Sequence, residues 1–236
     1  MPDEKRIMVI GAHAADAELM GGAAVLAHRA LGWNSVLVHM TLGEKGGRTV
    51  APAEYAAVKR SQAEQAAAIL RSDVEFLPYL DGELPINEHV QWQLADLIRK
   101  YQPTVILTHW KGSIHVDHTN TYENVLASLF FAGLPTFERE YPAHWVRGIY
   151  FAENWEDEDD YVPDTYLDVS DVWDTYVEAA ASYSLVSAPD GPFRYAQWYD
   201  GASRMRGAER GVDRAVALLH HQPFYARRYL KTSLEP

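Results

Sequence analysis

Near the start of the chain, a histidine and an aspartate are placed where they could bind a metal ion together. His13 and Asp16 directly follow the apolar run 7–10, which is typical of a strand buried on both faces. Imidazole nitrogen and carboxylate oxygen are both common zinc ligands. Asp16 alone is also a natural N-cap for the helix that should follow, because its side chain can accept a backbone N–H bond. The segment therefore predicts half of a metal site at the end of a strand.

The second half of this site is expected in a later loop. Residues 104–108 predict another buried strand, and the histidine-rich loop 109–118 follows it and ends in His118. Because loops at the carboxyl ends of parallel strands line one crevice, we expect His118 to meet His13 and Asp16 there. Three protein ligands with a fourth position left for water are typical of catalytic zinc. The chain contains no cysteine, which excludes a thiolate site.

Two short motifs carry a resemblance to a known family. Residues 13–16 read His-Ala-Ala-Asp and residues 115–118 read His-Val-Asp-His, each after a predicted strand. They resemble the His-Pro-Asp-Asp and His-Pro-Asp-His motifs of the LmbE-like or PIG-L family of zinc-dependent N-deacetylases. The likeness covers about residues 5–219 of a single domain predicted over residues 1–236, with 220–236 as a C-terminal tail. Its further marks are residues 21–22, 41–46, Arg60 with Glu64, 81–84 and 206–211.

The resemblance implies a role for each residue of the two motifs. His13, Asp16 and His118 correspond to the metal ligands, for Zn²⁺ or another divalent transition metal. His115 corresponds to the group that stabilises the oxyanion or protonates the leaving amine, and Asp117 to a carboxylate that orients an imidazole. The implied reaction is the deacetylation of an N-acetylated amino sugar, commonly an N-acetylglucosaminyl conjugate, by water that the metal activates.

One position departs from the family pattern. The first aspartate of the family motif is its general base, and Ala15 stands there in this chain. Three accounts remain open: an aspartate replaced to trap a ligand, natural divergence with a substitute base, or a catalytically impaired member that binds metal and sugar conjugates. Ala14 in place of the family's proline argues against a single deliberate replacement. Glu18 and Glu44 are the candidate substitute bases.

Four further residues are predicted to contact substrate. Arg60 is expected to bind a hydroxyl or phosphate, although an i, i+4 ion pair with Glu64 explains it equally well. Glu44 belongs to a loop expected beside the site. Trp110 is expected to stack on a sugar, the alternative being an ordinary rim aromatic. His109 is expected to touch substrate or metal, the alternative being a hydrogen bond at the end of a strand.

Composition agrees with an enzyme-sized domain and excludes other classes. With 236 residues and 47% hydrophobic content the chain can bury one core. The net charge of −12 opposes binding to nucleic acid, and the acidic run 156–160 is interpreted as a solvated loop. The apolar runs are far shorter than the roughly 20 residues of a membrane span, and the polar start predicts no signal peptide. We therefore expect a cytoplasmic protein with no membrane partner, and the sequence leaves homo-oligomerisation open.

The order of predicted elements indicates an α/β fold. Strands and helices alternate, which favours a Rossmann-like, mostly parallel sheet with helices on both faces. A dinucleotide site is excluded because residues 11–16 lack the second and third glycines of its fingerprint. The expected strands lie near 6–12, 35–41, 74–77, 104–108, 147–152 and 166–169, and the expected helices near 17–31, 53–70, 88–101, 119–131, 172–184 and 203–219.

Overall fold

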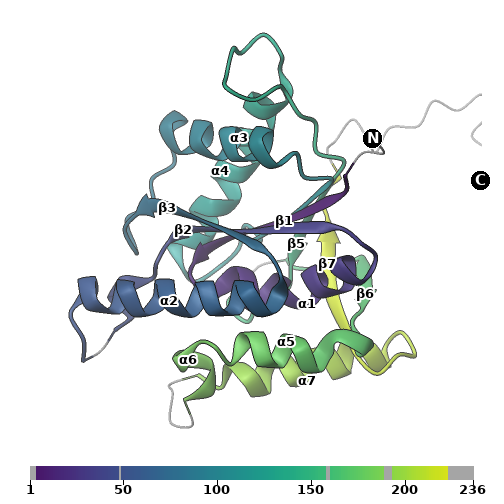
Figure 1. The fold of residues 1–236 in the computed structure, drawn as a ribbon. Helices are drawn as coiled ribbons and strands as arrows, with labels where there is room; N and C mark the ends of the chain where they lie inside the picture. Colours follow the sequence, from purple (N-terminus) through teal and green to yellow (C-terminus); the bar gives the residue numbers. More distant parts are fainter. Residues whose placement is uncertain (1–3, 48, 158–159, 189–192, 223–236) are drawn as a thin grey trace, which may run out of the picture.

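Alternating strands and helices build a central, mostly parallel sheet (Figure 1). The computed structural model describes all residues except 1–3, 48, 158–159, 189–192 and 223–236. Within the described residues the sheet has seven strands in the order β3-β2-β1-β4-β5-β7-β6, and β7 runs antiparallel to both of its neighbours. The strands are β1 (Arg6–His13), β2 (Asn34–Thr41), β3 (Asp73–Tyr79), β4 (Val105–Thr108), β5 (Gly148–Ala152), β6 (Thr165–Asp168) and β7 (Ala215–His220).

Helices cover both faces of this sheet, which confirms the predicted fold class. One face carries α1 (Asp16–Ala30) and α2 (Pro52–Leu70), and the other carries α3 (Glu88–Tyr101) and α4 (Val116–Gly133), as Figure 1 shows. A further layer packs outside α1 and α2. It consists of α5 (Trp173–Ala180), α6 (Ser184–Ser187) and α7 (Tyr195–Ala208), and the short 3-10 helices η1 (Glu44–Gly46) and η2 (Ser170–Val172) lie in connections.

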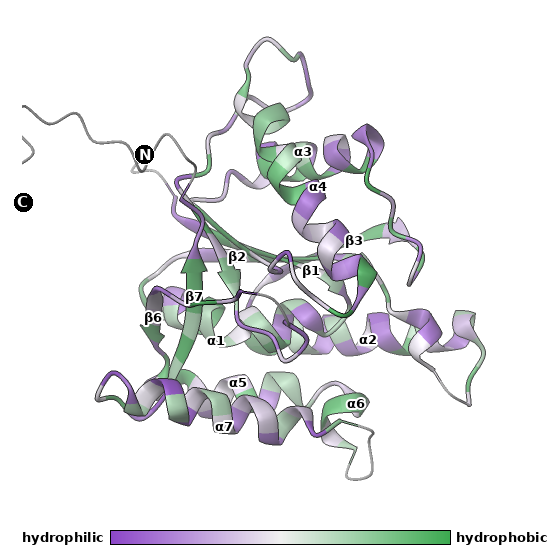
Figure 2. Ribbon diagram, turned by 180° about the vertical axis from the view of Figure 1, so that it is seen from behind, coloured by the Kyte–Doolittle hydropathy of each residue, from purple (hydrophilic) through white to green (hydrophobic). Residues whose placement is uncertain are grey.

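The alternation of side chains along β1 explains the two-sided cover. Ile7 and Val9 belong to the core under α1 and α2, whereas Met8 and Ile10 belong to the core under α3 and α4. All four are fully buried, and burying each such side chain contributes about 1.5–3 kcal/mol. Figure 2 shows the same pattern as hydrophobic central strands between helices of mixed hydropathy.

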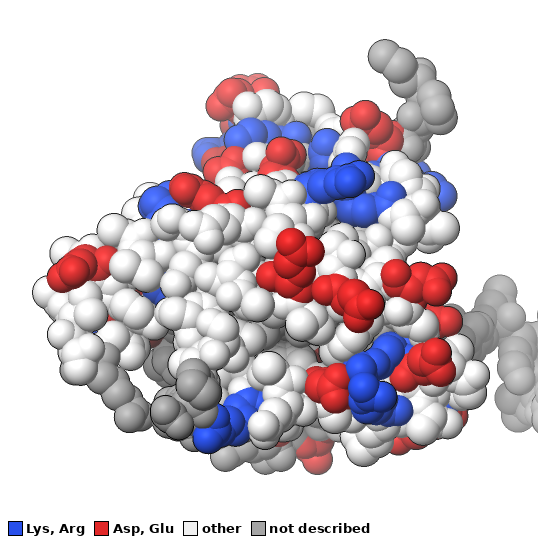
Figure 3. Space-filling model, turned by 60° about the horizontal axis from the view of Figure 1, so that its bottom comes forward, with Lys and Arg blue, Asp and Glu red and all other residues white. Residues whose placement is uncertain are grey.

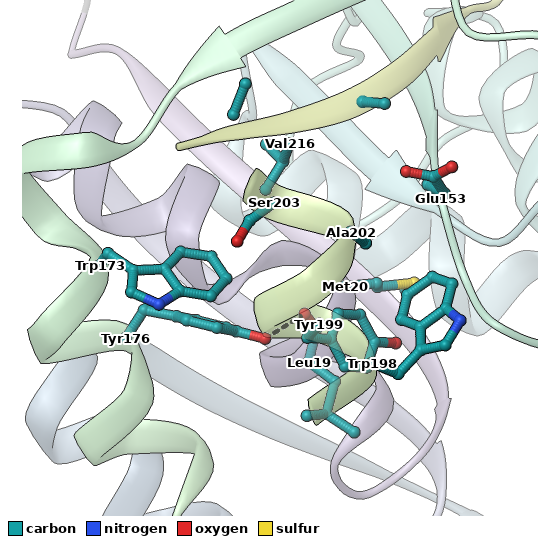
Figure 4. Close-up of a pocket in the computed structure, with 12 residues that line it drawn as sticks. Leu19, Met20, Glu153, Trp173, Tyr176, Trp198, Tyr199, Ala202, Ser203 and Val216 are labelled. Carbon is teal, nitrogen blue, oxygen red and sulfur yellow. Dashed lines mark hydrogen bonds between the residues drawn. The ribbon is translucent and has the colours of Figure 1, made fainter. Parts of the chain in front are cut away.

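A tyrosine of α5 anchors the outer helical layer to α1. The hydroxyl of Tyr176 on α5 donates a hydrogen bond to the backbone carbonyl of Leu19 on α1 at 2.9 Å (Figure 4). Trp173 packs against Tyr176 with ring centroids 4.6 Å apart. The cavity drawn in Figure 4 holds only about 20 Å³, which is room for a single water molecule. At this contact the outer layer is therefore closely packed against α1 and the sheet.

The predicted final helix over residues 203–219 is wrong. Helix α7 ends at Ala208, and residues 215–220 form strand β7. Gly211 adopts a positive φ of 74° in the turn between them, a conformation that glycine accepts without steric cost. The chain reverses there and enters the sheet between β5 and β6. Long-range pairing with two strands outweighs the local helical pattern that the prediction used.

The hydropathy of the described helices and the surface charges agree with what the amino-acid composition leads one to expect. None of the described helices is long and apolar enough to cross a membrane. On the face drawn in Figure 3, acidic side chains lie among the basic ones. The tail predicted from residue 220 begins where β7 ends, and its residues 223–236 lie outside the described residues.

Two glycines of α7 allow a matched stability test. A Cβ placed on Gly207 would lie 2.7 Å from the Val212 carbonyl oxygen and 2.9 Å from the Arg214 nitrogen, whereas one on Gly201 would meet nothing within 4 Å. We expect Gly207→Ala to lower the free energy of unfolding by about 1–3 kcal/mol through overpacking. Gly201→Ala should raise it by about 0.5–1 kcal/mol through helix propensity. Urea unfolding measures both, and equal stabilities would contradict the close packing at Gly207.

Candidate active site

The turn between β1 and α1 sets the first half of the site. His13 ends β1 and Asp16 begins α1, and the Asp16 Oδ2 atom accepts a hydrogen bond from the His13 backbone N–H at 2.8 Å. Ala15 between them has φ 103°, a strained backbone conformation for a residue with a Cβ. Ala15 itself occupies the N-cap position of α1, without a side-chain cap bond. The alternative interpretation of Asp16 as an N-cap is therefore wrong.

The structure brings together the three predicted metal ligands. His13 Nδ1 lies 3.0 Å from Asp16 Oδ2 and 3.3 Å from His118 Nε2, and the latter two atoms are 3.1 Å apart. Ligands 2.0–2.1 Å from a tetrahedral zinc ion are separated by roughly 3.3 Å. The three atoms therefore have the spacing that one tetrahedral ion requires.

Two carboxylates lie close to Nε2 of His13, the ring nitrogen that is not part of the ligand cluster. Asp117 Oδ2 lies 3.2 Å and Asp81 Oδ1 3.3 Å from His13 Nε2. Asp117 is held in turn, because Oδ2 accepts the Gly82 N–H and Oδ1 accepts the Leu84 N–H. Burial alone would lower the pKa of His13, but Asp16, Asp117 and Asp81 together hold that pKa well above its usual range. The surroundings of this ring thus stabilise positive charge.

The His118 ring has its own carboxylate partner. Glu156 Oε2 lies 2.9 Å from His118 Nδ1, with the Ser113 hydroxyl 3.2 Å from the same nitrogen. Burial lowers the pKa of His118, but Asp16 and Glu156 outweigh burial and raise that pKa to about 9. The interpretation of 156–160 as a solvated loop is wrong for Glu156, whose side chain is 13% exposed, and for Asp157, whose pKa burial raises to about 7.

His115 faces the site with a defined tautomer. Its Nδ1 atom accepts the Asp117 backbone N–H at 3.2 Å and caps α4. A neutral ring therefore carries its proton on Nε2, which lies 3.8 Å from Asp81 Oδ1. Burial and the neighbouring His13 and His118 rings lower the pKa of His115, which favours this neutral form. The ring can donate one hydrogen bond towards the pocket.

His109 lies behind the ligands, fully buried. Its Nε2 atom accepts the Ala12 backbone N–H at 2.9 Å, and its ring stacks on His118 with centroids 4.0 Å apart. Burial and the His118 charge lower the pKa of His109 to about 4, so the ring is neutral. The structure shows the hydrogen bond at the end of a strand, and His109 does not line the pocket. Its Nε2 atom also lies 3.5 Å from Asp16 Oδ2, so contact of His109 with a metal held by Asp16 and His118 stays a prediction.

A pocket of about 360 Å³ opens in front of these groups. This volume lies in the usual range for small-molecule sites. The histidines and carboxylates come from the strand ends and the loops that follow them, and α2, α6 and the start of α7 supply further lining residues that include Lys59. The pocket lining consists of His13, Ala14, Ala15, Asp16, Leu19, Gly43, Gly46, Tyr55, Lys59, Asp81, His115, His118, Glu156, Leu185, Ala188 and Tyr195.

Four predicted site residues are placed elsewhere. Glu18 is 1% exposed and points at His39, with 3.2 Å between Oε1 and Nε2. Glu44 is also buried, and its Oε1 atom accepts the Asp81 N–H, so Glu44 positions a lining residue without lining the pocket. The Arg60 guanidinium stacks over the Phe76 ring. It forms no ion pair with Glu64 and does not line the pocket. Trp110 packs on Phe151, Tyr122 and Tyr161, as a structural aromatic does.

Three lining residues were missed by the sequence interpretation. Lys59 precedes Arg60 on α2, and one step along a helix turns a side chain by about 100°, so the two side chains face different surroundings. Glu156 was hidden in the acidic run. Asp81 stands in one of the family-like motifs and could have been found there, since it lies shortly after the predicted strand 74–77. The contacts of Lys59 and Glu156 had no signal in the sequence alone.

The fold and the site together define an α/β protein with two histidines and an aspartate arranged for a divalent metal. Residues 8–129 match the PIG-L family, described as GlcNAc-PI de-N-acetylase. The chain therefore belongs to the PIG-L family, whose relatives are deacetylases and hydratases.

The relatives of the chain include a protein named as a hydratase and a protein named as a deacetylase. It is 25% identical to 4-oxalmesaconate hydratase of Pseudomonas putida, over 87% of this chain and 81% of that protein. It is 24% identical to diacetylchitobiose deacetylase of Thermococcus kodakarensis, over 77% and 70% of the two chains. The solved structure of GalB, the 4-carboxy-2-hydroxymuconate hydratase of P. putida, superposes with a TM-score of 0.82 at 22% identity and covers 97% of this chain and 99% of its own. The N,N'-diacetylchitobiose deacetylase of Pyrococcus horikoshii gives 0.79 at 21% identity, with 94% and 88% covered.

Metal analysis tests the ligand set. We expect the purified protein to bind one divalent ion per chain and His118→Ala to lose it, because two remaining ligands cannot complete the site. His89→Ala, at an exposed position, is the matched control and should keep the ion. Plasma mass spectrometry after dialysis measures both, and a His118→Ala protein with full metal content would contradict the assignment.

The contact of Glu156 with the His118 ring predicts a smaller loss of metal affinity than the removal of a ligand. We expect Glu156→Gln to weaken zinc affinity about 10- to 100-fold, since a carboxylate that holds a ligating imidazole fixes the ring and raises its basicity. Competition with a zinc-sensitive dye measures the dissociation constant. Glu138→Gln, at an exposed position, controls for the loss of one charge. Unchanged affinity in Glu156→Gln would show that the contact is incidental.

Proposed function

We propose that the protein is a zinc-dependent hydrolase that deacetylates an N-acetylated amino sugar, with an N-acetylglucosaminyl conjugate as its substrate. The observation that carries the proposal is the mutual spacing of 3.0–3.3 Å between His13 Nδ1, Asp16 Oδ2 and His118 Nε2 at the floor of an open pocket. Membership of the PIG-L family supports the same chemistry.

The residues present fit a divalent cation. Carboxylates surround the two ligand imidazoles and hold the pKa of each above its usual range, and the charges of His118 and His13 hold the pKa of Asp16 well below its usual range although burial opposes this. His13, Asp16 and His118 would hold the ion. When bound, such an ion polarises a carbonyl group and lowers the pKa of water.

The chain's own residues supply the remaining functions. His115 presents Nε2–H to the pocket and would donate a hydrogen bond to the oxygen that gains charge as the amide carbonyl is attacked; removing one such donor typically costs about 100- to 1,000-fold in rate. Asp117 and Glu156 keep the His13 and His118 rings in place.

Ala15 favours a second candidate, a hydratase. Of the described lining residues, only Asp16, Asp81 and Glu156 carry carboxylates, and each is already within 3.3 Å of an imidazole nitrogen. The pocket thus lacks a carboxylate free to take a proton at the position where the family resemblance expects one. The similarity to 4-oxalmesaconate hydratase, which extends over 87% of this chain, supports addition of water to an unsaturated acid as the alternative.

Turnover assays with a restored carboxylate separate these candidates. We expect the zinc-loaded protein to release acetate from N-acetylglucosamine conjugates, His118→Ala to be inactive, and Ala15→Asp to be about 100-fold faster or more, in line with the usual contribution of a general base. His89→Ala should match the unmodified protein. Thermal unfolding of each variant shows whether it is folded.

The other outcomes of the same assays are equally definite. His118-dependent loss of the ultraviolet absorbance of 4-oxalmesaconate, without acetate release from any conjugate, would replace the deacetylase proposal with the hydratase. Binding of conjugates without any turnover, in Ala15→Asp as well, would identify a metal and sugar-conjugate binding protein.

A further inference from the structure

A lysine that the sequence did not single out reaches the edge of the metal site. Lys59 lies on α2, is 4% exposed and lines the pocket. A Cβ placed on Gly43 would lie 3.2 Å from His13 Cβ and 3.7 Å from Lys59 Cε. The end of the Lys59 side chain therefore lies beside the turn that carries His13, with only a glycine between them.

Among the residues that the structure describes, the ammonium group of Lys59 has no counter-ion at contact distance. In the part of the chain that the structure describes, its Nζ atom makes neither an ion pair nor a hydrogen bond. The Nζ atom lies over the Tyr183 ring, with the centroid 4.9 Å away. The carboxylates of Asp16, Glu18 and Asp81 act on it from longer range. Asp16 and Asp81 are held by imidazoles, and Glu18 lies beside His39.

This arrangement costs folding free energy. Removing an ammonium from water without a hydrogen-bonding partner is unfavourable, and burial lowers the pKa of Lys59 to about 8 although Asp16, Glu18 and Asp81 oppose the shift. A lysine kept for stability would be paired. A lysine that is 4% exposed, lines an open pocket and has no counter-ion among the described residues is placed to meet a partner that arrives with the substrate.

We propose that Lys59 binds a carboxylate of the substrate, next to the group that the metal site attacks. The inference rests on the metal site of the proposed function, and it names the substrate class more narrowly. An amino-sugar conjugate would carry an acid close to its acetamido group, and the substrate of a hydratase would be an unsaturated acid with more than one carboxylate. A neutral sugar leaves this cation unpaired.

Binding of simple acids by the zinc-loaded protein tests this. Isothermal calorimetry with acetate, malonate, succinate and glutarate compares one carboxylate, which the metal site alone can take, with two. We expect at least one diacid to bind 10-fold or more tighter than acetate, and Lys59→Met to remove that preference while leaving the acetate affinity unchanged. Lys45→Met is the matched control, because Lys45 lies in the neighbouring 3-10 helix and pairs with Glu83 on the surface.

A stability measurement excludes a merely structural role. Methionine has nearly the shape of lysine without its charge, so Lys59→Met should unfold at the same temperature as the unmodified protein or at a higher one. A fall in unfolding temperature together with an unchanged diacid preference would overturn the proposal, as would an unmodified protein that binds acetate and every diacid equally. Lys59→Arg, which keeps the charge, should keep part of the preference.

The diacid-binding measurement does not depend on whether the protein turns over a substrate. Diacid binding through Lys59 in a protein that neither releases acetate nor hydrates an unsaturated acid would leave the inference standing and reject the proposed function. Turnover of neutral conjugates that is unaffected in Lys59→Met would reject the inference about Lys59 and leave the proposed function standing.

Discussion

The hydrogen bond from the His13 backbone N–H to the Asp16 carboxylate is the contact on which the site depends. It closes the turn between β1 and α1 and forces Ala15 into a positive φ that costs on the order of 1 kcal/mol or more. In return, both side chains point to the same side of the strand end. His118, in the first turn of the helix α4 that follows the neighbouring parallel strand β4, then lies within 3.3 Å of His13 and 3.1 Å of Asp16. Local strain and the parallel pairing of β1 with β4 together produce one compact set of ligand atoms.

The rings that meet there are held on their outer sides as well. Asp117 and Glu156 each lie close to the nitrogen of His13 or His118 that does not face the ligand cluster. Without a cation this would be a costly concentration of buried charge, because several carboxylates and imidazoles leave water together. The raised pKa of both histidines expresses the same imbalance, namely that the site is built to stabilise more positive charge than the neutral rings supply. A divalent ion would satisfy the carboxylates in the same geometry.

What the sequence could predict follows from how far each interaction reaches. The positions of His13, Asp16 and His118 depend on strand ends of a parallel sheet, which periodic apolar runs reveal, and these three residues were found together as expected. Side chains on helices were predicted less well, because a shift of one residue changes the face: Arg60 stacks on the outer surface, whereas the residue before it lines the pocket. Glu156 was missed for another reason. Its partner His118 is distant in sequence, and an acidic run in a loop carries no periodic signal that could mark one member as buried.

The two reactions found among relatives both begin with attack of water on an electrophilic carbon, the carbonyl carbon in amide hydrolysis and a carbon of the carbon–carbon double bond in hydration, and they differ in where the protons go. Amide hydrolysis needs a group that takes a proton from water and one that gives a proton to the amine. In this chain the neutral His115 ring can donate a hydrogen bond through Nε2–H, and Ala15 leaves the first task without a free carboxylate among the described lining residues. Hydration returns the proton to carbon and releases no amine. A pocket with strong charge stabilisation, one imidazole donor and Lys59 in its lining is therefore suited to holding an anionic substrate in either reaction, and the proton balance at Ala15 decides which of the two reactions this scaffold performs.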